Sequence, residues 1–124
     1  MGIQLQHHPS TQDNYFSHII DSLNIGLISV DQSGTILAFN PAAEKISGRE
    51  RADVLGGDFD GALGHGFFQN GDLQFGLIKE IDANTEIASR VQRFDKQCID
   101  VFLSIAPVLS KNGKKVGKIG RAHV

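Results

Sequence analysis

Cysteine is nearly absent from the sequence, with Cys98 the single one among 124 residues. One cysteine excludes an internal disulfide and any multi-cysteine zinc or iron–sulfur site within one chain. It fits a reducing compartment, so we expect the protein to be cytoplasmic. We interpret Cys98 as a small buried or edge residue rather than a redox sensor, because most unpaired cysteines act in packing.

Long apolar runs and an excess of one charge are also absent. No stretch approaches the roughly 20 apolar residues that span a bilayer, and residues 1–12 lack the pattern of a signal peptide. The formal net charge is −2, which gives no overall attraction to nucleic acid or to an anionic membrane, and we expect neither as a partner. The basic side chains near the end of the chain are interpreted as the solvated face of a hairpin: Lys111, Lys114, Lys115, Lys118 and Arg121.

Motifs of catalysis are missing as well. The five histidines lack H-E-x-x-H spacing, no serine lies in a G-x-S-x-G context, and there is no G-x-x-x-x-G-K-[ST] phosphate loop. The glycine-rich residues 56–71 lack the strand–G-x-G-x-x-G–helix order of a dinucleotide site. We therefore predict no catalytic residue, no metal site and no enzyme in this chain.

Hydrophobic residues make up 40% of the sequence, enough for the core of one domain. We expect residues 1–12 to be a flexible tail and residues 13–124 to form a single domain that begins with a helix over 13–24. Apolar residues recur along this helix at i, i+3, i+4 and i+7, the single stripe of an amphipathic helix. The stripe consists of Phe16, Ile19, Ile20 and Leu23.

A hairpin and a capped helix come next. Residues 25–30 and 35–39 are short apolar runs, and the Asp31-to-Gly34 turn between them predicts two antiparallel strands. Asn40-Pro41 predicts a helix start, because Asn caps free N–H groups and Pro fits the first helical position.

Glycines shape the middle of the chain. Gly48 is placed to end the first short helix, and a second helical piece is expected over 51–55. Between Gly56 and Gly71 we expect short turns, because an interior Gly costs a helix about 1 kcal/mol relative to Ala. Three phenylalanines should anchor these turns to the core: Phe59, Phe67 and Phe68. A helix is predicted over 72–81, where Leu73, Leu77 and Ile81 fall four apart.

The last forty residues carry a strand pattern. Residues 86–94 predict one strand, and alternation over 99–105 predicts the next. Pro107 indicates an edge, a bulge or a strand end. Asn112-Gly113 predicts a hairpin, since both residues tolerate positive φ, and residues 115–124 would be the returning strand. This order of elements predicts an α+β domain with one antiparallel sheet.

Residues 25–48, I-G-L-I-S-V-D-Q-S-G-T-I-L-A-F-N-P-A-A-E-K-I-S-G, resemble the PAS family. PAS domains show a strand, an Asp-to-Gly turn, a second strand, then Asn and a short helix. The resemblance covers about residues 13–124, although the glycine-rich middle matches only in length and character. It implies a five-stranded antiparallel sheet of order 2-1-5-4-3 with short helices on one face. It also implies a sensory module of a bacterial signalling protein, such as a histidine kinase, a cyclase or a transcription activator.

The sequence lacks the residues with which PAS domains bind heme or attach a flavin covalently. Heme-binding PAS domains carry a ligand histidine on the helix before the third strand, but residues 72–81 contain none, and His65 lies upstream. Light-sensing flavin PAS domains need a cysteine in a G-N-C-R-F-L-Q type motif, and residues 64–69 contain none. The sequence argues against heme and covalent flavin and leaves any other cofactor unknown.

A ligand pocket of such a domain would be lined by inward apolar residues of both layers. The candidates are Ile28, Val30, Phe39, Phe67, Leu77, Ile81, Val101, Leu103 and Ile105. Plain core packing is the competing interpretation of each, because apolar residues at these spacings are usually core. Ser104 or Arg90 could supply a polar contact.

We hold two hypotheses of function. In the first, the chain is a signal-input module that binds a small ligand and relays a conformational change to an output module absent from this chain. In the second, it is a ligand-free interaction module that forms a homodimer through the apolar stripe of the 13–24 helix. The sequence leaves the ligand, the output module and the oligomeric state open.

Overall fold

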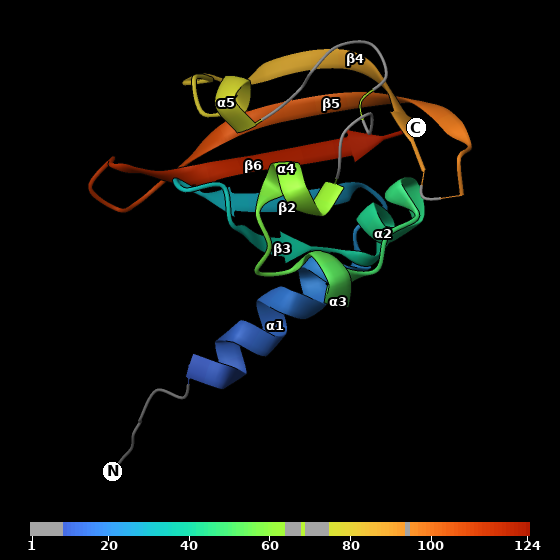
Figure 1. The fold of residues 1–124 in the computed structure, drawn as a ribbon. Coiled ribbons are helices and arrows are strands. Elements are labelled where there is room, and N and C mark those ends of the chain that lie inside the picture. Colours follow the sequence, from blue (N-terminus) through green and yellow to red (C-terminus); the bar gives the residue numbers. More distant parts are fainter. Residues whose placement is uncertain (1–8, 64–67, 69–74, 94) are drawn as a thin grey trace.

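The computed structural model describes residues 9–63, 68, 75–93 and 95–124, with the side chains of residues 9–14 left aside. One antiparallel sheet carries short helices on one face (Figure 1). The strands are β2 (Gly26–Asp31), β3 (Ile36–Phe39), β4 (Thr85–Gln92), β5 (Cys98–Leu109) and β6 (Lys115–His123). The helices are α1 (Pro9–Ser22), α2 (Pro41–Ser47), α3 (Arg51–Val54), α4 (Phe59–Leu63) and α5 (Phe75–Ile78).

The five strands lie in the order β3-β2-β6-β5-β4, which is 2-1-5-4-3 when they are counted along the sequence. The predicted α+β class and strand order are confirmed. The first and last parts of the chain meet at the centre, where β2 pairs with β6 from Gly26↔Ala122 to Asp31↔Gly117. The first and the last strand of the chain therefore lie side by side in a single sheet.

The β2–β3 turn forms as predicted. Asp31 Oδ1 accepts from the backbone N–H groups of Ser33 at 2.9 Å and Thr35 at 3.0 Å. Gly34 takes a φ of 90°, which an L side chain rarely adopts. The hydrogen bond from the Ser33 hydroxyl, with the backbone bonds, holds the pKa of Asp31 below its usual value.

Asn40 begins α2 and also joins three elements. Its Oδ1 accepts from Ala43 N at 2.9 Å, the expected cap, and from Leu27 N at 2.8 Å. Its Nδ2 donates to the carbonyls of Ile20 at 3.1 Å and Ile25 at 2.9 Å. The side chain thus uses its full hydrogen-bonding capacity while it is buried.

The ends of α2 and α3 also follow the sequence signals. Gly48 caps α2 with a left-handed φ of 71°. The N-terminus of α3 is capped from α2, because Glu44 Oε2 accepts from Arg51 N at 2.7 Å. Arg49, between α2 and α3, donates to the Leu63 carbonyl at the end of α4 at 2.7 Å, and burial lowers the pKa of this guanidinium.

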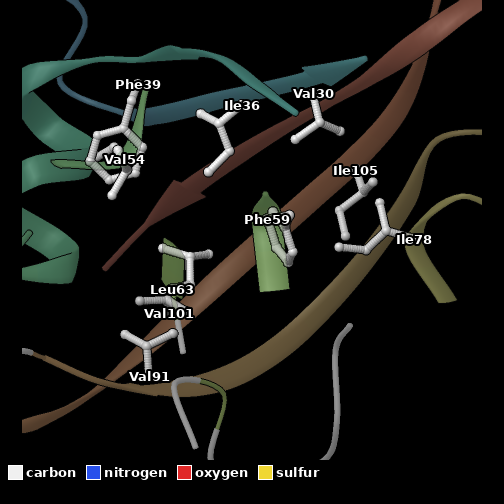
Figure 2. Packing of buried hydrophobic residues seen from close by; sticks show 11 residues of the cluster. Val30, Ile36, Phe39, Val54, Phe59, Leu63, Ile78, Val91, Val101 and Ile105 are labelled. Carbon is white, nitrogen blue, oxygen red and sulfur yellow. The ribbon is translucent and has the colours of Figure 1, made fainter. Parts of the chain in front are cut away.

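The core fills the space between the inner face of the sheet and the helices (Figure 2). Side chains of strands and helices converge there. The labelled cluster comprises Val30, Ile36, Phe39, Val54, Phe59, Leu63, Ile78, Val91, Val101 and Ile105.

Helix α1 begins at Pro9, inside the stretch that the sequence assigned to a tail. It projects away from the sheet (Figure 1), and the described contacts hold it at its C-terminal end through the Asn40 bond to Ile20 and an Arg51–Asp21 ion pair at 3.3 Å. The apolar stripe is accordingly open to solvent, with Phe16 56%, Ile19 43% and Leu23 39% exposed.

The helix predicted over 72–81 is wrong in extent, because α5 covers only Phe75–Ile78 among the described residues. A turn follows, in which Ile81 N donates to the Ile78 carbonyl. Because the helix ends at Ile78, positions 77 and 81 do not share a helical stripe, and position 73 lies outside the described residues. Ile78 is therefore the buried residue, and Leu77 is 60% exposed.

The C-terminal hairpin is confirmed with one difference. Gly113 has a φ of 80°, whereas Asn112 keeps a negative φ, so only the glycine uses the left-handed region. Pro107 lies within β5, past Ile105, which pairs with Thr85, the first residue of β4. At Pro107 only β6 remains as a neighbour, and Pro107 pairs with Lys118. A register shift follows at Val108/Leu109, consistent with the edge or bulge that the proline indicated.

Candidate functional site

A cavity of about 80 Å³ lies inside the domain, between the sheet and the helices. Its floor is made by the inward positions of four strands: Ile28 and Val30 of β2, Val91 of β4, Val101, Leu103 and Ile105 of β5, and Lys118, Gly120 and Ala122 of β6. Its roof comes from the helical layer: Ala43, Ile46 and Ser47 of α2, Phe59 of α4, Ile78 of α5, and Phe68. The walls are almost entirely apolar.

Small residues on β6 explain why space remains at this point. Gly120 lies opposite Ile28 on one side and Ile105 on the other, in the middle of the sheet. A Cβ built on Gly120 would come no closer than 3.9 Å to another heavy atom, the Ile28 carbonyl oxygen. The absent side chain leaves volume that larger neighbours do not fill.

The structure brings together five of the predicted pocket residues. The side chains that line the cavity are Ile28, Val30, Val101, Leu103 and Ile105. Phe39 is buried in the core and Ile81 packs against it, but neither lines the cavity. Leu77 faces solvent, for the reason given above, and Phe67 lies outside the described residues. Phe68, the next phenylalanine, takes a place on the wall.

The α2 and β6 residues of the wall were missed from the sequence. The sequence does place small residues at the alternate positions 120 and 122 of β6. Their place on the cavity wall follows only when the pairing register of β6 with β2 is known. Ala43 and Ser47 lie one turn apart on α2, and both are buried.

Ser104 and Arg90 cannot contact the cavity, because they lie on the outer face of the sheet. Ser104 Oγ is within 3.0 Å of Asn84 Oδ1 and accepts from Arg121 Nη2 at 2.9 Å. Arg90 Nε donates to Asp100 Oδ1 at 2.9 Å, and this bond raises the pKa of the guanidinium. The suggestion that either contacts a ligand in the cavity is wrong.

Lys118 also departs from the sequence interpretation. It was grouped with the solvated lysines of the hairpin, yet it is only 8% exposed. The alternation of β6 explains this, since Lys118 points inward with Gly120 and Ala122, whereas Lys115 and Arg121 are exposed. It is the only charged residue on the cavity wall among those described.

Cys98 is exposed at the first position of β5. Within the described ranges, no three His, Cys, Asp or Glu residues are grouped to hold a metal ion. His65, the heme candidate, lies outside those ranges. No helix in the described part of the chain is long and apolar enough to cross a bilayer.

The fold and cavity define a class, the single-sheet α+β domain whose helices enclose an apolar space against the sheet. Residues 14–61 match the family model described as the PAS fold. Photoactive yellow protein from Rhodothalassium salexigens is 48% identical over 40 residues, which are 32% of each sequence, so the match spans about a third of this relative.

Solved structures agree with the family match. The PAS domain of an HTR-like protein from Haloarcula marismortui has a TM-score of 0.71 at 13% identity, with 92% of both chains covered. The LOV protein of Rhodobacter sphaeroides has a TM-score of 0.68 at 18% identity, over 94% of this chain and 68% of that one. The chain has the fold of PAS domains, and its residues 14–61 carry the sequence match to that family. PAS domains are generally sensory modules rather than catalytic ones.

Proposed function

We propose that this PAS domain senses a small apolar ligand in the cavity and relays its binding to an output module of the same parent protein. The observation that carries the proposal is the cavity itself, which is walled by both layers of the fold. A ligand there would touch the sheet and the helices at once. It would act by binding one arrangement of these layers better than another, because only differential affinity shifts a population.

A route from the cavity to α1 supports the relay. Ala43 and Ile46 of α2 form part of the wall. Asn40 caps the start of α2, and its side-chain amide also donates to the Ile20 carbonyl near the end of α1. A ligand that displaces α2 would therefore change the support of α1, the element that leaves the domain in Figure 1.

Cavity size limits the ligand. The volume of about 80 Å³ is roughly half that of an engineered 150 Å³ cavity that binds benzene. Pockets for drug-sized molecules and cofactors are several times larger, about 300 Å³ or more. The ligand we propose is therefore much smaller than a flavin or a heme.

Amide NMR of the full chain can test the proposal with a panel of neutral compounds of about three to six carbon atoms. We expect shifts at Ile28, Leu103 and Gly120, and at Ile20 if the relay operates. The Gly120→Val variant should lose these shifts, because valine fills the cavity. Ala106→Val, which also introduces valine but on the outer face, should keep them. If no compound perturbs the cavity amides, the proposal is wrong.

We also propose that the chain forms a homodimer through α1, because an exposed apolar stripe on a projecting helix favours it. A lone helix of 14 residues is marginal in water, so packing against a second copy would stabilise α1. Sedimentation of the full chain should show a dimer. Ile19→Glu should dissociate it, and Ser17→Glu, an exposed position off the stripe, should not. A monomer at high concentration in the unmodified chain would remove this proposal.

A further inference from the structure

We propose that the ligand is a short-chain carboxylate, with its hydrocarbon chain in the cavity and its carboxylate beside Lys118. This rests on the proposed function and names the ligand class for the same cavity. The starting point is Lys118, a lysine whose side chain is largely buried in the cavity wall, with only 8% of the residue exposed. None of the ion pairs among the described residues involves it.

Lys118 stands between two spaces. One is the apolar cavity, and the other is a neighbouring hollow of about 250 Å³ that opens beside α5 and the β2–β3 turn. The side chain lines both. Lysine buries its methylene stem against apolar surface and directs its ammonium to the polar side. We infer that the stem forms cavity wall and that the ammonium faces the hollow.

The hollow carries an excess of positive charge. Lys79, Lys115 and Lys118 line it, and Asp31 is the only acidic residue on its wall among those described. The Asp31 carboxylate is already engaged by the N–H groups of its own turn. Lys115 has one distant carboxylate, Asp82 Oδ2 at 4.0 Å. An anion at the hollow would meet cations that lack close partners in the described structure.

An apolar space next to a cationic hollow fits a molecule with an apolar chain and one anionic end. A carboxylate accepts charge-assisted hydrogen bonds from an ammonium, and these are stronger than neutral ones. The cavity of about 80 Å³ limits the buried chain to about three or four carbon atoms. Butanoate has the required form, whereas acetate has no chain to fill the cavity.

The test compares butanoate with 1-butanol and with acetate, by NMR titration of the full chain. Butanoate should bind more tightly than either. Lys118→Met keeps the apolar stem and removes the charge, so it should weaken butanoate binding by about tenfold or more and leave 1-butanol unchanged. The matched control is Lys111→Met in the exposed hairpin turn, which should change neither affinity.

A second measurement does not depend on a variant. In the unmodified chain with ¹³C-labelled lysine, butanoate should shift the Cε signal of Lys118, and 1-butanol should shift it far less. If 1-butanol binds as well as butanoate and Lys118→Met has no effect, the carboxylate assignment is overturned while the apolar sensor stands. If none of the neutral panel or the acids enters the cavity, the proposed function falls with it.

Discussion

The hairpin–helix unit of residues 26–48 and the segment of residues 75–81 both present apolar side chains to the core, yet they are fixed in different ways. In the first, side chains hold the backbone at each turn, through Asp31 at one end and Asn40 at the other. In the second, a single helical turn starts with Phe75 N donating to Asp60 and buries Ile78. Side-chain hydrogen bonds to nearby backbone groups set the first, whereas the second depends on the packing of Ile78 and on one contact with Asp60, which is distant in the sequence.

The largest effect is expected at Asn40, where the first region is held. Asn40→Ala removes four hydrogen bonds and leaves the N–H groups of Leu27 and Ala43 without their buried acceptor. We expect a loss of about 3 kcal/mol in the free energy of unfolding, measured by urea denaturation. Asn24→Ala, at an exposed position, is the control and should be nearly neutral. Similar small losses for both variants would show that Asn40 does not fix this unit.

Adjacent residues of α5 give the next largest contrast. Ile78→Ala should lower the free energy of unfolding by about 2 to 4 kcal/mol, because it removes most of a buried side chain and leaves a void in the core. Leu77→Ala should change stability by less than about 0.5 kcal/mol, because Leu77 is exposed. Denaturation curves of both variants test which side of α5 faces the core. The reverse order would restore the orientation that the sequence suggested.

A comparison within β6 involves two glycines. A Cβ on Gly117 would overlap the Val30 carbonyl oxygen of β2, so Gly117→Ala must push the two strands apart. We expect it to cost about 2 kcal/mol. Gly120→Ala has room for its methyl group and should change stability by no more than about 1 kcal/mol. Thermal unfolding of the pair would measure this, and equal costs would contradict a free volume at Gly120.

The same contrast explains what could be predicted from the sequence. Asn40-Pro41, the Asp31-to-Gly34 turn and Gly113 act on their own neighbours in the chain, so their roles were readable without tertiary structure. The alternation of β5 also gave the inward residues correctly, because a strand has only two faces.

What sequence reasoning missed depends on partners that are distant in the chain. Lys118 looked like one more solvated lysine until β6 was placed in register between β2 and β5. Leu77 looked inward because a ten-residue helix was assumed, and α5 is shorter. The strand order itself came from the PAS resemblance, since periodicity does not say which strands are neighbours.

The smallest effect concerns pH and the turn that opens the first region. Hydrogen bonds from Ser33 and Thr35 lower the pKa of Asp31 in the folded chain below its unfolded value. The stability that this carboxylate contributes is therefore present above the unfolded pKa and is lost as the pH falls through the folded pKa. Asp31→Asn should reduce the loss of stability on acidification, measured by unfolding at neutral and acidic pH. Asp53→Asn, at an exposed residue of α3, is the control. An unchanged pH dependence of stability in Asp31→Asn would show that the charge of Asp31 does not stabilise the turn.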